Sequence, residues 1–407
     1  MTSALNLPEH GANLAGGPEI LAIPGPSIIP DRVLAAMGRQ MTDIYVGDLV
    51  RLSDEVFAGL SAVARTASEP FVAISNGHGA WEMALSNTLS RGDKVVVFDC
   101  GGFAAGWADM ATFNGLDVEL IFAEPGRAVD PAAVEERLRA DPAHQFKAVL
   151  MVHVDTGTSL RNDIEAMRLA IDAAAHPALF MVDCIASLGC ERYEMDEWGV
   201  DVTVAASQKG LMTPPGLGIV WASERALVAH QHADLRTYYW DWTARQNRDA
   251  HYQRYAGTPP VSHLFALGEA LRMIAEEGLE NVWHRHRVIG SAVRAAVGAW
   301  VAPGGIELQA KVASEQANSV TSVRTGSIDA QVIRGLCQEM MRVTLGIGLR
   351  GESASSFRIG HMGHVNAPGI LGVLGAIDTA LDVINAPRSG SGAAAAAAVL
   401  AAAIAGE

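Results

Sequence analysis

The sequence predicts an α/β protein, with a mainly parallel sheet in a large domain followed by a smaller α+β domain. Short apolar runs alternate with helical stretches between residues 71 and 183, which is typical of parallel strands joined by crossover helices. Hydrophobic residues at 49% and charged residues at 18% fit a globular protein with a large core, and 407 residues leave room for two domains. The net charge of −15 argues against nucleic acid or an anionic membrane as main partner, because both require a basic surface.

The region before the alternation is expected to be an arm, a rigid loop and two helices. Residues 1–20 are polar and glycine-rich, and we expect an arm that orders only against another surface. Residues 21–29 hold a Pro-Gly-Pro turn, which fixes the path of a loop. Asp31 is expected to cap a helix that ends near residue 38, and residues 49–67 have the apolar spacing of a second helix.

The alternating region places its glycine-rich and polar loops after strands. The predicted strands are 71–74, 94–98, 118–122, 148–153, 178–182, 200–206 and 217–221. The predicted helices between them are 80–89, 104–113, 131–140 and 164–175. The loops at 76–79, 101–103, 155–158 and 183–187 all follow the carboxyl end of a strand. Ligands of open α/β sheets bind at that edge, so these loops are expected to converge on one site.

The C-terminal half is expected to form the smaller domain. Residues 237–260 are dense in aromatic side chains, which seldom face water without covering something. Helices are expected at 262–277, at 281–301 and from Asp329, with strands at 319–324, 343–346 and 357–360. Residues 390–406 are alanine-rich and helix-forming, with no function assigned. The expected parts are an arm (1–20), a large domain (21–265), a small domain (266–386) and an Ala-rich tail (387–407).

Asp183 and Lys209 form the most informative pair of residues. Each follows a short apolar run, and two adjacent strands would bring the carboxylate and the amine to the same sheet edge. Pyridoxal phosphate requires such an acid facing its pyridine nitrogen and such a lysine for covalent attachment. Residues 75–79 add a strand, a glycine turn and a helix N-terminus, which together favour a phosphate group. As a dinucleotide motif this stretch is weak, because Glu82 stands where the third glycine is required.

Cysteine usage and the termini point to the cytoplasm. The four cysteines (Cys100, Cys184, Cys190 and Cys337) show neither a CxxC pair nor the spacing of a metal site. We therefore expect reduced thiols, as in a cytoplasmic protein. The N-terminal stretch lacks the basic and apolar regions of a signal peptide, and no stretch reaches the roughly 20 apolar residues of a membrane span.

Six strings occur in order over most of the chain, from about residue 21 to 384: PGPSIIPDRVLAAM, GHGAWEMALSNTL, MVDCIASLG, DEWGVDVTVAASQKGLMTPPGLG, YAGTPPV and FRIGHMG. They resemble the class V aminotransferases of fold type I, close to the serine–glyoxylate and alanine–glyoxylate aminotransferases. The resemblance implies a mainly parallel seven-stranded sheet, pyridoxal 5′-phosphate as cofactor, and a homodimer with shared active sites. It also implies transfer of an amino group from a small amino acid, serine or alanine favoured, to a small 2-oxo acid such as glyoxylate.

The resemblance also assigns roles to individual residues. Lys209 would bond the cofactor and move the α-proton, Asp183 would hold the pyridine nitrogen protonated, and Arg358 would clamp the substrate carboxylate. Tyr255 and Thr258 would reach the phosphate from the neighbouring subunit, and Tyr45 lies in the substrate loop. The implied cofactor-binding set is Gly77, His78, Gly79, Phe103, Thr156, Thr158, Asp183, Ile185, Gln208, Tyr255 and Thr258.

Two stretches depart from the family pattern and leave the substrate open. Relatives carry a His-Arg pair where this chain has residues 45–48, and an Asn-Glu-Thr string where it has residues 154–156, followed by Gly157. If Asp48 faces the pocket, it would disfavour an acidic donor such as aspartate. Other donor and acceptor pairs, such as aspartate or pyruvate, stay open.

Three further classes of function are alternatives. A lyase or a desulfurase of the same fold is one, although a desulfurase needs a thiolate on a mobile loop and Cys337 lies in a helical pattern. A non-catalytic binder is a second, against which Lys209 and Asp183 argue. A metal enzyme that uses His361 and His364 is a third, although no carboxylate lies near them in the sequence.

Overall fold

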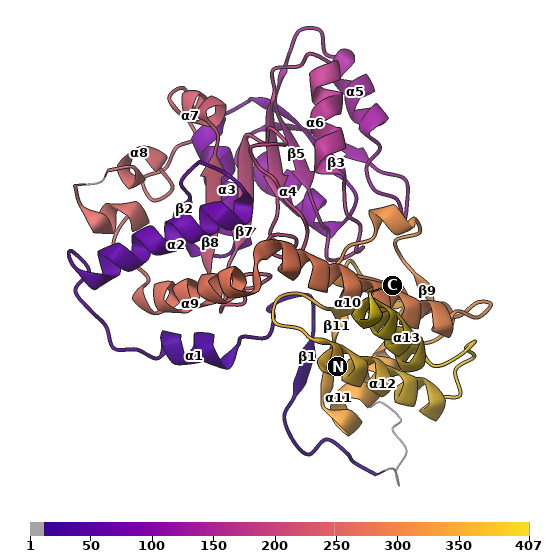
Figure 1. Cartoon of the computed structure of the whole chain (residues 1–407). Coiled ribbons are helices and arrows are strands. Elements are labelled where there is room, and N and C mark those ends of the chain that lie inside the picture. The colour runs from indigo at the N-terminus through magenta and orange to yellow at the C-terminus, as the bar shows by residue number, and fades with distance from the viewer. Residues whose placement is uncertain (1–11, 248, 407) are drawn as a thin grey trace.

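The computed structural model describes residues 12–247 and 249–406, so the first 11 residues of the expected arm lie outside the described part. Its larger sheet has seven strands in the order β2-β8-β7-β6-β5-β3-β4 (Figure 1). The strands are β2 (Phe71–Ser75), β3 (Lys94–Asp99), β4 (Asp117–Phe122), β5 (Phe146–Val152), β6 (Leu179–Asp183), β7 (Val202–Ala206) and β8 (Gly216–Ala222). Strand β8 pairs antiparallel with β2 and β7, and the pairs from β7 through β4 are parallel. The predicted α/β fold with a mainly parallel sheet is confirmed.

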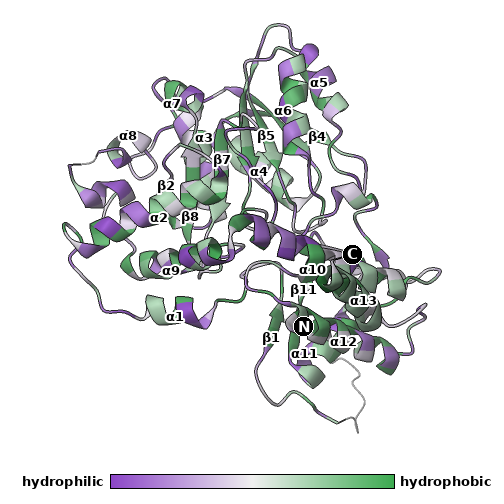
Figure 2. Cartoon of the chain, in the orientation of Figure 1, coloured by the Kyte–Doolittle hydropathy of each residue, from purple (hydrophilic) through white to green (hydrophobic). Residues whose placement is uncertain are grey.

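Helices cover both faces of this sheet, and successive side chains of each strand point to opposite faces. In β3, Val96 and Phe98 join the core with α2, α5, α6 and α9, whereas Val95 and Val97 join the core with α3, α4 and α7. These helices are α2 (Asp48–Ala64), α3 (Gly77–Thr88), α4 (Gly102–Phe113), α5 (Pro131–Arg139), α6 (Ile164–Ala173), α7 (Glu224–His230) and α9 (Val261–Glu277). The strands are mostly hydrophobic in Figure 2, as burial on both sides requires.

The predicted cap of the first helix is wrong by one position. Helix α1 (Asp31–Met37) has Pro30 as its N-cap residue, with no side-chain cap hydrogen bond. Asp31 lies in the first turn, where its negative charge interacts favourably with the helix dipole. Its side chain accepts no capping hydrogen bond.

A second sheet, in the order β1-β11-β12-β10-β9, combines four strands from the C-terminal part of the chain with β1 from the N-terminal part. Its strands are β1 (Ile20–Ala22), β9 (Glu307–Leu308), β10 (Val320–Arg324), β11 (Val343–Ile347) and β12 (Ser356–Gly360). The helices that form a separate core with it are α10 (Leu279–Trp300), α11 (Ala330–Met341), α12 (Ala367–Val383) and α13 (Gly392–Ala405). Strand β1, expected to be part of the arm and loop, pairs parallel with β11. The predicted domain boundaries stay predictions.

The Ala-rich tail folds as helix α13 and packs against α10 and α12 (Figure 1). Its start is fixed by Asp378 of α12, whose carboxylate accepts from the Gly392 N–H group at 2.9 Å and from the Ser391 hydroxyl at 2.6 Å. The same carboxylate accepts from the indole N–H of Trp300 at 2.7 Å. One buried acid therefore joins three helices.

Some aromatic side chains of the stretch 237–260 pack against the hydrophobic core, as expected, and others are exposed. Trp242, in the short helix α8 (Trp242–Arg245), stacks on Phe71 with ring centroids 4.8 Å apart. Tyr255, in the 3-10 helix η1 (His251–Tyr255), is 1% exposed, whereas Tyr238 is 91% exposed. Within the described residues, no helix is both long and apolar enough to cross a membrane. The cytoplasmic location stays a prediction.

Candidate active site

A cavity of about 230 Å³ lies at the carboxyl ends of β2, β3, β5, β6 and β7. The predicted site residues that line it are Gly77, His78, Phe103, Thr156, Asp183, Ile185, Gln208 and Lys209. Four residues not predicted as site residues complete the lining, namely Asn76, Trp81, Val154 and Ala186. The parallel pairing of β6 with β7 brings Asp183 and Lys209 to the same sheet edge, as the sequence predicted.

Asp183 is fixed at the end of β6 by two donors. Its Oδ1 accepts from the backbone N–H of Ile185 at 2.7 Å, and its Oδ2 accepts from the indole N–H of Trp81 at 2.9 Å. Burial raises the pKa of Asp183 to about 7, against the opposing effect of both hydrogen bonds. A cationic ring nitrogen placed against this acid would favour its ionised form. Sequence analysis missed Trp81, because nothing in the local pattern shows that its indole reaches a residue 102 positions away.

Lys209 is an almost wholly buried amine. Burial, with a smaller contribution from the positive charge of Arg358, lowers its pKa to about 8. Its Nζ donates to the backbone carbonyl of Pro24. A Cβ atom on Gly25 would lie 2.5 Å from that Nζ, and the φ of Gly25 is +101°, so only glycine fits this approach. The Pro-Gly-Pro loop therefore packs directly on the lysine.

The start of α3 is capped by a residue that the sequence analysis did not assign. The side chain of Asn76 accepts from the N–H groups of His78 and Gly79, at 3.0 and 3.3 Å. Asparagine directly before a helix is a strong capping signal, so this contact was predictable. Gly77 and His78 line the cavity and Gly79 does not. The phosphate contacts assigned to Gly77, His78 and Gly79 stay predictions.

Two buried polar atoms of cavity-lining residues have no hydrogen-bond partner within the described part of the chain. They are the hydroxyl oxygen of Thr156 and the Oε1 atom of Gln208. Buried polar groups without partners cost free energy, and sites that bind polar ligands are where such groups persist. The polar lining thus fits a polar cofactor, with a phosphate group near a helix N-terminus and a ring nitrogen near Asp183.

Arg358 lies in β12, near the cavity but not in its lining. It is 8% exposed, and its guanidinium donates to the carbonyl of Ile347 at 2.7 Å and to that of Thr156 at 3.0 Å. Burial lowers the pKa of Arg358 to about 10, at which it stays charged at neutral pH. The contact with Thr156 connects the sheet that contains β12 to the loop after β5, whereas the contact with Ile347 lies within that sheet.

Several predicted residues do not line the cavity of their own protomer. Thr158 bonds Asp155 through its backbone and hydroxyl, and Tyr255 donates to the hydroxyl of Ser53 at 2.8 Å. Thr258 is exposed, and Tyr45 is 63% exposed. Their predicted roles stay predictions.

The substrate loop does not bring the charge of Asp48 into the cavity of this protomer. Asp48 is the first residue of α2, is exposed, and pairs with Arg51 one helical turn later. The hypothesis that Asp48 repels an acidic donor therefore has no support within one protomer.

The cysteines and His361 are packed into the structure. All four thiols are buried and free, and burial raises the pKa of Cys190 and of Cys337 to about 12. None is therefore a ready thiolate for desulfurase chemistry. Both ring nitrogens of His361 are engaged, by the hydroxyl of Thr321 at 2.8 Å and the carbonyl of Asn318 at 2.9 Å.

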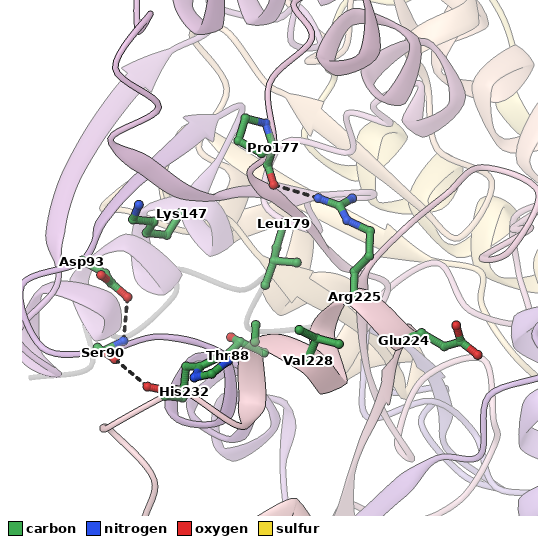
Figure 3. Close-up of a pocket in the computed structure, with 12 residues that line it drawn as sticks. Thr88, Ser90, Asp93, Lys147, Pro177, Leu179, Glu224, Arg225, Val228 and His232 are labelled. Atoms are coloured by element: carbon green, nitrogen blue, oxygen red, sulfur yellow. Dashed lines mark hydrogen bonds between the residues drawn. The ribbon is translucent and has the colours of Figure 1, made fainter.

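A larger cavity, of about 680 Å³, lies at the opposite sheet edge, where β3, β5 and β6 begin (Figure 3). Two of its charged side chains have local partners. Arg225 donates to the carbonyl of Pro177 at 2.7 Å, and Asp93 accepts from the Ser90 N–H at 2.7 Å. None of its lining side chains, all in the described part, has a buried polar atom without a partner. The smaller cavity, with its perturbed acid and amine, is thus the candidate active site.

Comparisons with known proteins agree with this site. The aminotransferase class-V family profile matches residues 21–362. The chain is 41% identical to a serine–glyoxylate aminotransferase of Methylorubrum extorquens, over 93% of this chain and 95% of that one. It is 38% identical to an L-aspartate–glyoxylate aminotransferase of Paracoccus denitrificans, over 92% and 94% of the two chains. Among solved structures, it resembles pyridoxamine–pyruvate aminotransferase from Mesorhizobium loti, with a TM-score of 0.86, 26% identity, and coverage of 97% and 99%. The chain therefore belongs to the class V aminotransferases, a pyridoxal phosphate-dependent family, and is a transaminase.

Proposed function

We propose that this transaminase moves the amino group of a small amino acid, with serine or alanine favoured, to glyoxylate. The observation that supports this most is the cavity that joins Asp183, Lys209 and the unpartnered polar atoms of Thr156 and Gln208, close to Arg358. Two of the proteins named above are glyoxylate aminotransferases, one with serine and one with aspartate as the named amino acid. Aspartate is the second candidate donor, because Asp48 puts no charge into the cavity of its own protomer.

The residues of this chain divide the chemistry as follows. Bound pyridoxal phosphate supplies an electron sink for the charge that remains after the α-proton leaves. Lys209 would hold the cofactor covalently and, when free, carry the proton at its Nζ. Asp183, oriented by Trp81 and Ile185, would hold the ring nitrogen with its carboxylate. Arg358 would hold the carboxylate that amino acid and 2-oxo acid have in common, so one arginine serves both half-reactions.

A donor panel tests the proposed function. The purified, cofactor-loaded enzyme is mixed with serine, alanine or aspartate in turn, and conversion of the cofactor to its amino form is followed by absorbance. We expect the fastest conversion with serine or alanine and the reversal of the spectrum by glyoxylate. If no amino acid converts the cofactor, transamination is wrong for this enzyme and a lyase becomes the better hypothesis.

The pKa of Lys209 predicts the pH dependence of cofactor attachment. At pH 8 about half of the Lys209 amines are neutral, because burial lowers the pKa from 10.5 to about 8. An ordinary lysine is only about 0.3% neutral at that pH. The neutral amine is the nucleophile, so the attachment rate of pyridoxal phosphate to the apoprotein should rise with pH and level off above 8. Stopped-flow absorbance measures this rate; a midpoint near 10 would contradict the proposal. In Arg358→Ala the midpoint should move up, because the charge of Arg358 contributes to the lowering.

We also propose a homodimer with shared active sites. Thr258 is exposed in the single protomer, and so are the neighbouring residues Tyr45 and Val46, at 63% and 65%, with the ring of Tyr252 edge-on to that of Tyr45. Large apolar side chains that gather on a surface mark interaction sites. Tyr255 would need to share its hydroxyl between Ser53 and a partner's phosphate, so Thr258 is the better test of a contact across the dimer.

Mixing two inactive variants tests the shared site. Lys209→Ala lacks the lysine, and Thr258→Glu places a negative charge where the phosphate of the partner's cofactor is expected. A hybrid dimer keeps one intact site, so random mixing should restore about one quarter of wild-type activity. Mixing Lys209→Ala with itself is the control. A wild-type enzyme that is active as a monomer at assay concentration would refute the shared site.

A further inference from the structure

Asp155 is a buried carboxylate that joins two loops of the active site. It follows β5 and has no exposed surface. Its Oδ1 accepts from the backbone N–H groups of Gly157 at 2.8 Å and Thr158 at 3.0 Å, and its Oδ2 accepts from the N–H of Phe103 at 2.8 Å. Sequence analysis noted Asp155 only as a departure from the family string. These contacts give it a position between the loop after β3 and the loop after β5.

The approach of these loops is close. A Cβ atom on Gly101 would lie 2.2 Å from the carboxyl carbon of Asp155, so the loop after β3 can pass only because this residue is glycine. Phe103, in the first turn of α4 directly after this loop, and Thr156 from the other loop both line the active-site cavity. A single carboxylate therefore fixes the distance between two walls of the cavity.

Asp155 also supplies negative charge near two buried cations. In the described part of the chain, the guanidinium of Arg358 hydrogen-bonds to no carboxylate, and it donates at 3.0 Å to the carbonyl of Thr156, the residue next to Asp155. Burial lowers the pKa of Arg358, and the charge of Asp155 is the main effect that opposes this. It acts in the same direction on Lys209, more weakly than Asp183 does.

We propose that Asp155 is a positioning residue that sets both the width of the cavity and the strength of the carboxylate clamp. Its hydrogen bonds hold the Phe103 wall against the Thr156 wall. Its charge moderates the attraction of Arg358 for a carboxylate, which must be released as product in each half-reaction; binding that is too tight in the ground state does not increase kcat. The second role rests on the proposed function of Arg358, whereas the first does not.

Two substitutions separate the two roles. Asp155→Asn removes the charge and replaces one carboxylate oxygen with an NH₂ group, which cannot accept a hydrogen bond. The backbone N–H groups of one wall, either that of Phe103 or those of residues 157–158, therefore lose their acceptor. Asp155→Glu keeps the charge but is one methylene longer in a space already closed by Gly101. Asp201→Asn is the matched control. Asp201 is 2% exposed and accepts from the Phe180 N–H at 2.9 Å, at the sheet edge far from the site.

Amide hydrogen exchange of the apoprotein tests the loop role without the cofactor. In Asp155→Asn, the peptide of the wall that loses its acceptor, either the one with Phe103 or the one with residues 157–158, should exchange about tenfold faster than in the wild type. In Asp155→Glu both peptides should do so, since one lost hydrogen bond of about 1.4 kcal/mol is a factor of ten. In Asp201→Asn these peptides should exchange at the wild-type rate. Unchanged exchange in both Asp155 variants would overturn the loop role.

Binding of acetate to the cofactor-loaded enzyme tests the charge role, with the absorbance of the bound cofactor as the signal. Asp155→Asn should bind acetate about fivefold more tightly than the wild type, as expected from the loss of one nearby charge in a partly polar site. Asp155→Glu should stay within about twofold of the wild type. Equal or weaker acetate binding by Asp155→Asn would overturn the charge role. A wild-type protein that takes up no cofactor would instead refute the proposed function, while the exchange experiment would still decide the loop role.

Discussion

Replacement of Lys209 by alanine is expected to reduce turnover by more than about 10⁴-fold, the upper range for loss of a general base, because covalent attachment of the cofactor is lost as well. The amine is nearly fully buried, and its pKa lies near 8. Among the described residues that line the cavity, Lys209 is the one lysine, so no other amine there can take its place. The fold should be retained, since the side chain has one hydrogen bond, to the carbonyl of Pro24. Steady-state kinetics and circular dichroism measure the two effects.

Borohydride reduction followed by peptide mapping provides the direct check. The cofactor label should appear on the peptide that contains Lys209 in the wild type. It should also appear there in the control variant Lys147→Ala, which removes an exposed lysine at the opposite sheet edge. The label should disappear in Lys209→Ala. A label on any other lysine would contradict the assignment of Lys209 as the lysine that bonds the cofactor.

Replacement of Arg358 by alanine is expected to weaken the binding of both the amino acid and the 2-oxo acid by roughly 30-fold or more, because loss of a desolvated Arg–carboxylate contact costs about 2–5 kcal/mol of binding free energy. The absorbance of the bound cofactor should stay close to that of the wild type, since Arg358 does not line the cavity that contains Asp183 and Lys209. The measurement is KM for the amino acid and for glyoxylate, each at saturating concentration of the other.

Two further variants separate substrate binding from packing. Arg358→Lys keeps the charge but not the two-pronged fork, so it should recover only part of the affinity. Arg334→Ala removes a half-buried arginine that donates to the Leu345 carbonyl at 3.4 Å. KM for both substrates should stay at the wild-type value in Arg334→Ala. If KM for only one substrate rises in Arg358→Ala, the idea of one shared carboxylate clamp is wrong.

Much of the fold and the centre of the site could be predicted from local pattern. The strands around Asp183 and Lys209 are short apolar runs, and chain order alone makes them neighbours in a wound sheet. Ile185 and Gln208 were implied by the family resemblance, and both line the cavity beside these strands. The aromatic stretch was expected to cover something, and Trp242 does cover Phe71.

Two kinds of feature were missed. Some depend on contacts between residues far apart in the sequence, and one is a helix whose proline and glycines hide its helical pattern. The bond from Trp81 to Asp183 and the bond from Phe103 to Asp155 join positions that no periodic pattern links. Helix α12 was not predicted, because it begins Ala-Pro-Gly and contains further glycines, which lower helix propensity. Proline in the first turn is nevertheless tolerated, and Asn366 caps the helix by accepting from the Gly369 N–H.

Strand β1 has a consequence for how the chain assembles during synthesis. Ile20 pairs with Val343, so about 320 residues separate the partners of this strand pair. At about 5–20 residues per second, the ribosome would complete β11 roughly 15–65 s after β1 has been made. The strands of the larger sheet, which end with β8 at Ala222, are all synthesised within that interval. Strand β1 therefore stays without its partner β11 until most of the protein has been made, and closing the second sheet is among the last steps of folding on the ribosome.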